Sequence, residues 1–416
     1  GLFHGDQRGI AMTRPMIFTT MLLAASAAQA APATKPVADP LFKPLIDMRL
    51  RYENVDQTGF ANEANALTMR VRAGGDLRVA PATRILVEAE AVLGLVNDYN
   101  STTNGKLLYP VVADPENIEI NRLQISNKSI ANTTLTAGRQ RINLDDQRFV
   151  GAVAFRQSEQ TFDAARIETS PVKNLKIDLT YAWKDNTIFG VDSTIAHING
   201  NNVFANVAYA TPVGTLTGFG YWVDQDAPTR LQFSSVTYGA RFAGKYAFSK
   251  TANATYALSY AHQQQAFDNP FTYDADYYLA DVGLGFGGFA IGGGYEVLGS
   301  SSGKAFTAFQ TPLATLHKFQ GWADKFLTTP GNGVRDAYAS AGYTVTKVGP
   351  FASVSALAVY HDFKSDRGGF DYGSEIDLQL LAKFEKYVLT LKYADYNADS
   401  FATDTSKLWV SVDYVF

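Results

Sequence analysis

Two Arg-x-Arg pairs near the beginning of the chain are the residues whose spacing could do the clearest chemistry. Arg49 and Arg51 form the first pair, and Arg70 and Arg72 form the second. A guanidinium keeps its charge at physiological pH and can hold a carboxylate through two parallel hydrogen bonds. In a β-strand, residues two apart project from the same face, so each pair would present its charges together. The pairs therefore indicate a wall that binds an anionic solute.

Other charged residues share the parity of these pairs in the alternating pattern, and acids such as Glu88, Glu90 and Asp178 oppose the cations. The alternative is that both signs of charge only brace a channel wall, and for any single arginine this alternative is favoured. As a set, the cations favour an anion-binding lumen. The predicted solute-binding residues that line it are Arg49, Arg51, Arg70, Arg72, Arg122, Arg139, Arg141, Arg148, Asp163, Arg166, Lys176 and Arg241.

A second basic cluster lies in the run GRQRINLDDQRF, residues 138–149, with Asp163 beyond it. Arg139 and Arg141 fall on the parity of apolar residues, so a bulge or the end of a strand must turn them away from lipid. The segment is either a salt-bridged loop pinned at the outer rim or a loop folded inward to form a constriction. The sequence leaves both possibilities open.

Several catalytic patterns are absent or lack their context. The chain has no cysteine, which excludes disulfides, thiolate zinc sites and cysteine nucleophiles. Its histidines are scattered without ligand spacing, so we expect no metal. A GxGxxG match at residues 283–288 has no following helix, and a GxSxG match at residues 299–303 lies in a Ser/Gly loop. With no convincing Ser–His pair on adjacent strands, we expect neither an enzyme nor a cofactor.

Alternation with period two would position these side chains. From Lys43 onward it recurs in segments of about ten residues, for example Leu67 to Ala73 and Leu175 to Trp183. We predict eighteen strands, the first at 45–54, the fifth at 132–141 and the last at 407–416. A soluble sandwich would also alternate, so the connections must decide between the two architectures.

The connections alternate strictly in length. Minimal turns such as Ala80-Pro81-Ala82 and Ser170-Pro171-Val172 follow even strands, whereas long segments follow odd ones, at 96–115, 142–158, 185–200, 299–334 and 362–373. This alternation is typical of an up-and-down transmembrane β-barrel, with short periplasmic turns and long extracellular loops. We therefore predict an all-β, antiparallel, eighteen-stranded barrel over residues 43–416. In the longest connection, the spacing of Leu313, Leu316 and Phe319 after Pro312 predicts a helix of one to three turns packed over or inside the mouth.

The composition agrees with one exported domain. The chain has 416 residues, 46% of them hydrophobic and only 18% charged, with a net charge of −4. This disfavours disorder and gives no basic field for nucleic acid. Residues 12–30 have the order of a secretory signal peptide, ending in Ala28-Gln29-Ala30, and residues 1–11 are interpreted as a leader upstream of the true start at Met12. The outward stripe that ends at Phe416 resembles the signal that bacterial barrel assembly machinery reads.

The runs GRQRINLDDQRF and TPLATLHKFQGWADKF, together with eighteen strands and early Arg-x-Arg pairs, resemble the bacterial alginate export family of outer-membrane porins. The resemblance covers roughly residues 45–416. It implies a monomeric, arginine-lined channel in the bacterial outer membrane that passes a polyuronate outward. The function expected is the passage of anionic polysaccharide, oligosaccharide or another small acidic solute. The alternative is a selective uptake porin for sugars or small organic acids.

Overall fold

The computed structural model describes residues 40–415, which form eighteen β-strands and two short 3-10 helices. None of the helices in this range is long and apolar enough to cross a membrane. The strands are β1 (Phe42–Gln57), β2 (Ala64–Ala80), β3 (Thr83–Asp98), β4 (Asn117–Asn127), β5 (Thr133–Gln140), β6 (Thr161–Thr169), β7 (Leu175–Asn186), β8 (His197–Thr211), β9 (Gly214–Val223), β10 (Ser235–Ala247), β11 (Ala252–Gln265), β12 (Asp274–Phe286), β13 (Phe289–Leu298), β14 (Val334–Val348), β15 (Phe351–Lys364), β16 (Asp371–Phe384), β17 (Tyr387–Ala398) and β18 (Thr405–Val415).

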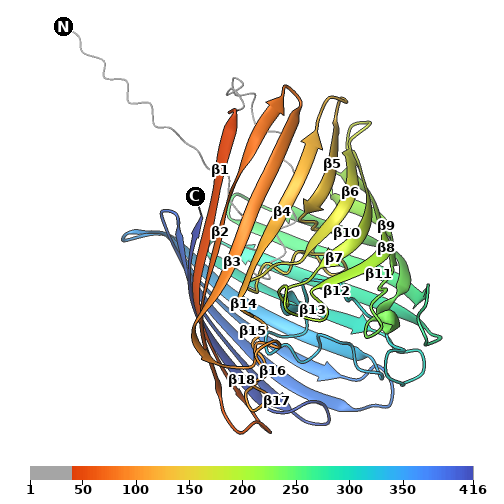
Figure 1. Cartoon of the computed structure of the whole chain (residues 1–416). Helices are drawn as coiled ribbons and strands as arrows, with labels where there is room; N and C mark the ends of the chain where they lie inside the picture. Colours follow the sequence, from red (N-terminus) through yellow and green to blue (C-terminus); the bar gives the residue numbers. More distant parts are fainter. Residues whose placement is uncertain (1–39, 416) are drawn as a thin grey trace.

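Each strand pairs antiparallel with its neighbours in the chain, and the sheet closes where β1 pairs with β18 (Figure 1). The closing register runs from Asp47 opposite Val415 to Gln57 opposite Thr405. Closure removes the sheet edges, so every strand can satisfy its backbone groups within the sheet. The predicted eighteen-stranded barrel is confirmed. Several strands extend two or three residues beyond their predicted bounds, because the tilted wall continues past the apolar stretch.

The connections divide the barrel into two ends. Those that follow even strands are two to five residues long and lie at one end, here called the short-turn end. Those that follow odd strands are six to thirty-five residues long and lie at the other, the long-loop end. The start of β1 and the end of β18 meet at the short-turn end. This is the predicted arrangement, with short turns towards the periplasm and long loops outside.

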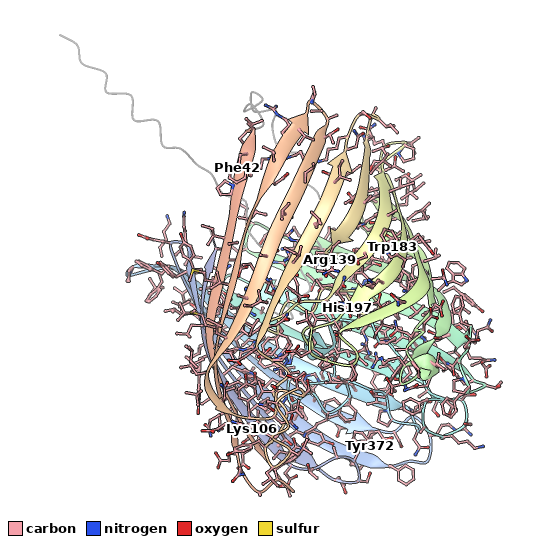
Figure 2. All side chains as sticks on the ribbon, in the orientation of Figure 1. Phe42, Lys106, Arg139, Trp183, His197 and Tyr372 are labelled. Atoms are coloured by element: carbon pink, nitrogen blue, oxygen red, sulfur yellow. The ribbon has the colours of Figure 1, made fainter. Side chains whose placement is uncertain are left out.

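Side chains alternate between the two faces of the wall, which Figure 2 shows as sticks around the whole barrel. In β7, Leu179 and Tyr181 are each 44% exposed on the outer face, whereas Thr180 and Ala182 between and beside them are buried. Exposed aromatic residues gather in two bands on this outer face. One band, towards the long loops, includes Trp183, Trp222, Tyr238, Tyr260, Tyr278 and Tyr360, and the other, towards the short turns, includes Phe42, Tyr209, Phe248, Phe286, Phe289 and Tyr387. Such paired girdles mark the two interfaces of a membrane.

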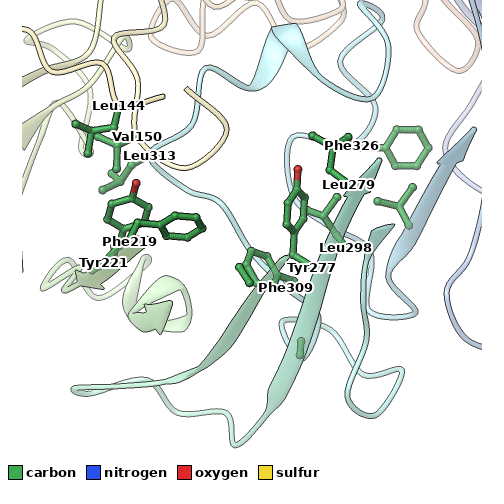
Figure 3. Packing of buried hydrophobic residues seen from close by; sticks show 14 of the residues in the cluster. Leu144, Val150, Phe219, Tyr221, Tyr277, Leu279, Leu298, Phe309, Leu313 and Phe326 are labelled. Atoms are coloured by element: carbon green, nitrogen blue, oxygen red, sulfur yellow. The ribbon is translucent and has the colours of Figure 1, made fainter. Parts of the chain in front are cut away.

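The lumen is filled in part by two long connections that fold inward: the first inward loop, residues 141–160, and the second inward loop, residues 299–333. Apolar residues of both loops pack against inward-facing wall residues in one buried cluster (Figure 3). Within it, Val150 forms a β-bridge with Leu313, and Phe149 contacts Phe219 and Tyr277 with ring centroids 5.1 and 5.3 Å apart. Of the two possibilities for residues 142–158, the inward-folded loop is therefore the correct one.

The second inward loop does not form the expected α-helix, so this prediction is corrected. Only Leu316–Lys318 forms a single 3-10 turn. Backbone groups that a helix would pair internally bind elsewhere instead: the amide of Thr315 donates to the carbonyl of Gln147, and the amide of Ala323 donates to the carboxylate of Glu375. A short helix is marginal without tertiary support, and here the tertiary contacts favour an irregular chain.

Three predictions fall on residues that the structure does not describe. The upstream leader 1–11, the signal peptide 12–30 and the terminal Phe416 lie outside residues 40–415.

Candidate functional site

The four arginines of the Arg-x-Arg pairs lie on the lumen side of β1 and β2, beneath the first inward loop. The guanidinium of Arg49 donates to the carbonyl of Phe155 at 2.9 Å, and that of Arg51 donates to the same oxygen at 2.5 Å. Arg72 donates to the carbonyl of Gln157 at 3.1 Å. Arg49, Arg51 and Arg72 therefore bind the backbone of the loop and hold it against the wall.

Each of these arginines also has a carboxylate partner. Arg49 pairs with Asp413 at 2.5 Å, and Arg51, Arg70 and Arg72 pair with Asp114, Asp47 and Glu90. Their exposed fractions are only 2–6%. A buried guanidinium of this kind needs its carboxylate, because an unpaired buried charge is costly. Nε of Arg51 and Nε and Nη1 of Arg70 have no hydrogen-bond partner, but all four side chains are ion-paired within the protein and have little surface left for a solute.

Arg148 and Arg156 connect the two inward loops. Arg148 is 1% exposed and donates to Glu296 of β13 at 2.7 Å and to Gln320 of the second loop at 3.0 Å. Arg156 donates to Glu53 of β1 at 3.1 Å and to Asp324 of the second loop at 3.1 Å. Although burial opposes the charged form, Glu53 and Asp114 raise the pKa of Arg156 above its ordinary value. Both arginines therefore connect the inward loops to the barrel wall through charged hydrogen bonds.

Three further predicted arginines on strands are partly exposed and paired. Arg122 binds Glu88 through two hydrogen bonds of 2.8 and 2.6 Å, and Arg166 binds Asp178. Arg139 binds Asp163 in β6 at 2.8 Å and also donates to the carbonyl of Ile120 in β4 at 2.9 Å.

Strand β5 ends at Gln140, where the chain leaves the wall and turns inward. This explains how Arg141 can be charged although it falls in register with lipid-facing apolar residues. Arg141 then binds Glu159 within the first inward loop, at 2.8 and 2.5 Å. Arg72 and Arg141 lower the pKa of Glu159 far below its ordinary value, against the opposing effect of its burial.

A cavity of about 1170 Å³ occupies the half of the lumen nearer the short turns. Its lining begins at the turn between β6 and β7, around Pro171 and Lys173, and ends at Gln147 and Phe319 of the two inward loops. Five cationic side chains line it, namely Lys173, Lys176, Arg241, Lys245 and Lys318. Five acids do so as well, namely Asp145, Asp146, Asp281, Glu296 and Asp336.

These charges are not evenly spread along the cavity. Lys173, Lys176 and Lys245 belong to the short-turn ends of the wall and are exposed, so they surround the mouth. Asp145 and Asp146 belong to the first inward loop, and Asp146 pairs with Arg241 at 2.9 Å. The cavity therefore has a basic mouth and a floor where acids and cations meet.

Of the twelve predicted site residues, only Lys176 and Arg241 line this cavity, and the others are ion-paired elsewhere in the lumen or wall. The sequence reasoning missed Lys173 and Lys318 as cavity residues. Lys173 lies in a five-residue turn, where side chains do not alternate regularly between the two faces of the wall. Lys318 lies in a loop whose path depends on tertiary contacts. Asp145 and Asp146 were visible as an acidic pair in the basic run, but the pattern gave them no position. Within residues 40–415, no group of three or more metal-ligating side chains is placed to hold a metal ion.

Comparisons with known proteins agree with this architecture. The family model described as alginate export matches residues 45–286, more than half of the chain. No curated protein matches the sequence. Among solved structures, OpdL of Pseudomonas aeruginosa aligns at 16% identity with a TM-score of 0.66, covering 90% of this chain and 98% of its own.

Two further structures have the same fold. OccAB2 of Acinetobacter baumannii aligns at 17% identity with a TM-score of 0.68, and the outer membrane protein OpdK of Pseudomonas aeruginosa at 12% identity, also with a TM-score of 0.68. Each covers 90% of this chain and 98% of the solved one. A closed barrel with lipid-facing aromatic girdles, loops folded into its lumen and a match over residues 45–286 leads to one assignment: this chain belongs to the alginate export family and is a β-barrel channel of the bacterial outer membrane.

Proposed function

We propose that this channel passes negatively charged saccharides, with an acidic polysaccharide or oligosaccharide as its solute. The observation that carries the proposal is the 1170 Å³ cavity, whose mouth is surrounded by Lys173, Lys176 and Lys245. Membership of a family described as alginate export supports a polyuronate-like solute. Small polar residues such as Thr215, Thr255 and Ser340 also line the cavity and can hydrogen-bond hydroxyl groups.

The mechanism requires no chemical step. Exposed ammonium groups at the mouth raise the local concentration of carboxylate-bearing solutes, because the low-dielectric wall focuses their field into the lumen. The buried arginines act indirectly, since Arg49, Arg51 and Arg72 hold the first inward loop that bounds the cavity. The arginine set predicted from sequence thus belongs to this proposal as the support of the site, with Lys176 and Arg241 in contact with the solute.

We also propose that the barrel is a monomer, that it has no enzymatic activity and that the C-terminal sequence of β18 together with Phe416 is read by the barrel assembly machinery. The register of β18 with β1 supports the last point, because this pair completes the closure of the sheet.

Reversal potentials in a planar bilayer test the proposed solute charge. Under a KCl gradient the wild-type channel should prefer chloride, and the preference should fall above about 1 M salt as the Debye length shortens to about 3 Å. Replacing Lys173, Lys176 and Lys245 together with Gln should reduce the preference. The control replaces Lys128, Lys250 and Lys347, which are also exposed at the short-turn end but do not line the cavity. A wild-type channel that prefers potassium would overturn the proposal.

A second candidate is the uptake of small organic acids. It is favoured by the buried cluster in the lumen, where both inward loops pack on the wall and reduce the space available to a polymer. OpdK, which shares the fold, has been crystallised with vanillate. Liposomes that admit benzoate-sized acids but exclude uronate trimers would favour this candidate over the first.

A further inference from the structure

Asp145 lies at the boundary between two cavities of the lumen. It lies in the first inward loop and lines both the large cavity and a smaller one of about 90 Å³ against β7, β8 and β9. Only Lys176 and Thr217 share this double position among the residues that line the two cavities. The carboxylate of Asp145 is therefore directed at the boundary between the open lumen and the wall.

Most acids that line the large cavity have a cationic or histidine partner. Asp146 pairs with Arg241 at 2.9 Å, Glu296 pairs with Arg148 at 2.7 Å, and Asp336 lies 2.9 Å from His361. None of the ion pairs among residues 40–415 includes Asp145. Its Oδ2 accepts a hydrogen bond from the side-chain amide of Asn206 at 2.7 Å, which is a neutral donor.

The backbone holds this arrangement in place. Asp145 has φ of +48° and Gln147 has φ of +70°, both in the left-handed region that residues other than glycine seldom adopt. The amide of Gln147 donates to the carbonyl of Leu144, and the carbonyl of Gln147 accepts from Thr315 in the second inward loop. The turn is thus fixed from both sides.

We propose that Asp145 determines the charge selectivity of the channel and makes it depend on pH, because its carboxylate opposes anions at the cavity floor until it is protonated. This inference rests on the proposed passage of anionic solutes and adds the residue that regulates it.

The surroundings of Asp145 give the direction and the range of the effect. Although the side chain of Asp145 is exposed to the lumen, desolvation by the surrounding protein and the adjacent carboxylate of Asp146 raise its pKa to about 6, against the opposing charge of Arg241. The group is therefore charged at pH 7.5 and neutral at pH 5, so acidification removes one negative charge from the floor. The titratable and charged groups that face it from the elements packed around it are Asp146, Lys176, Asp178, Tyr221, Arg241, Asp281 and Lys318.

The test is the reversal potential of the full-length channel under a KCl gradient, measured between pH 5 and pH 7.5. The wild type should shift towards chloride preference on acidification, half of the shift being complete near pH 6. Asp145→Asn should show the acid-like chloride preference throughout, with no step. Asp145→Glu should retain a step, which would show that the carboxyl group itself is required.

Asp281→Asn is the matched control, since Asp281 also lines the cavity and its carboxylate is bound only by the hydroxyl of Tyr338, at 2.6 Å. This variant should raise chloride preference but keep the step near pH 6. A wild type without a step, or an Asp145→Asn channel with an unchanged one, would overturn the inference. A channel that prefers cations at every pH but loses its step in Asp145→Asn would instead overturn the proposed solute charge and leave the role of Asp145 standing.

Discussion

Asp324 is the carboxylate on which both inward loops and the wall converge. Its Oδ2 lies 3.1 Å from Arg156 of the first loop and 2.9 Å from Lys407 of β18, and its Oδ1 accepts from His317 at 2.8 Å. Burial and the ammonium of Lys392 lower the pKa of His317 to about 3, so this imidazole is neutral and donates through Nδ1. Burial alone would raise the pKa of Asp324, but Lys407 and His317 hold it well below its ordinary value.

Asp324→Asn should therefore destabilise the lumen. The change leaves Lys407 and Arg156 buried without their shared carboxylate, and breaking a buried ion pair in this way costs about 3–5 kcal/mol. Arg156 keeps Glu53, which places the expectation at the lower end of that range. Urea denaturation in detergent micelles, followed by tryptophan fluorescence, measures the loss because Trp322 and Trp409 lie beside the network.

The control is Asp268→Asn, an exposed acid in the loop between β11 and β12, which should change stability by no more than about 0.5 kcal/mol. Equal unfolding midpoints for the two variants would show that Asp324 does not stabilise the contact between the inward loops and the wall.

At the scale of elements, the tip of the second inward loop is seated on two acids of β16. The amide of Trp322 donates to Asp377 at 3.2 Å, and that of Ala323 donates to Glu375 at 2.7 Å. Gly321 permits this approach, because its φ is +78° and a Cβ there would lie 2.3 Å from Oε2 of Glu375. The contact between the loop tip and β16 therefore depends on the absence of a side chain at Gly321.

Gly321→Ala should detach the loop tip from the wall. The matched control is Gly105→Ala, where φ is +70° but no atom lies within 4 Å of the added carbon. Both variants carry the backbone cost of about 1–2 kcal/mol for a left-handed alanine, so their difference isolates the clash with Glu375. Limited trypsin digestion of the second loop at Lys318 and Lys325 should accelerate only in Gly321→Ala. Identical digestion rates in the two variants would show that the loop does not need this seat.

These loops also mark where sequence reasoning stops. Strand β7 was predictable because Leu179 and Tyr181 alternate with Asp178 and Thr180, and that alternation follows directly from a wall with lipid on one face. The path of the second loop was not, because the hydrogen bonds that determine it come from residues far apart in the chain, such as Gln147 and Glu375. The helical spacing in this loop proved to be the spacing of residues that pack into a shared lumen core.

At the scale of the whole molecule, the sequence likewise predicts the barrel but not which side chains line its cavity. Closure, the strand count and the direction of the turns follow from local alternation and connection length. The arginine pairs were correctly placed on the lumen face, yet whether such a side chain meets solute depends on what covers it. Arg70 and Arg72 are 2% and 3% exposed beneath the first inward loop, whereas Lys173, in an unremarkable turn, lines the mouth.

The barrel also separates charge along its axis, which no single segment reveals. Among residues 40–415, seven exposed lysines lie at the short-turn end beside one exposed acid, Glu385: Lys128, Lys173, Lys176, Lys245, Lys250, Lys347 and Lys386. At the long-loop end of the same described range, eleven exposed acids outnumber four exposed cations, which are Lys304, Arg335, Lys364 and Arg367; the acids are Asp56, Glu63, Asp98, Glu116, Asp192, Asp226, Asp268, Asp274, Asp371, Asp399 and Asp404. A polyanion is therefore attracted to the periplasmic mouth and repelled from the outer one.

This separation predicts a sided block by an acidic polymer. Oligouronate added to the short-turn side of a planar bilayer should interrupt the ion current at a lower concentration than the same oligouronate added to the long-loop side. The orientation of the channel can be read from the compartment in which maleimide labels a Lys304→Cys variant, since Lys304 is exposed in the second inward loop. A neutral oligosaccharide of equal length should block equally weakly from both sides. The difference between sides should shrink as salt rises, because exposed charges more than a Debye length away are screened. A block that is equal from both sides at low salt would mean that the axial charge does not act on the solute, and that the attraction exerted by the mouth is confined to the cavity itself.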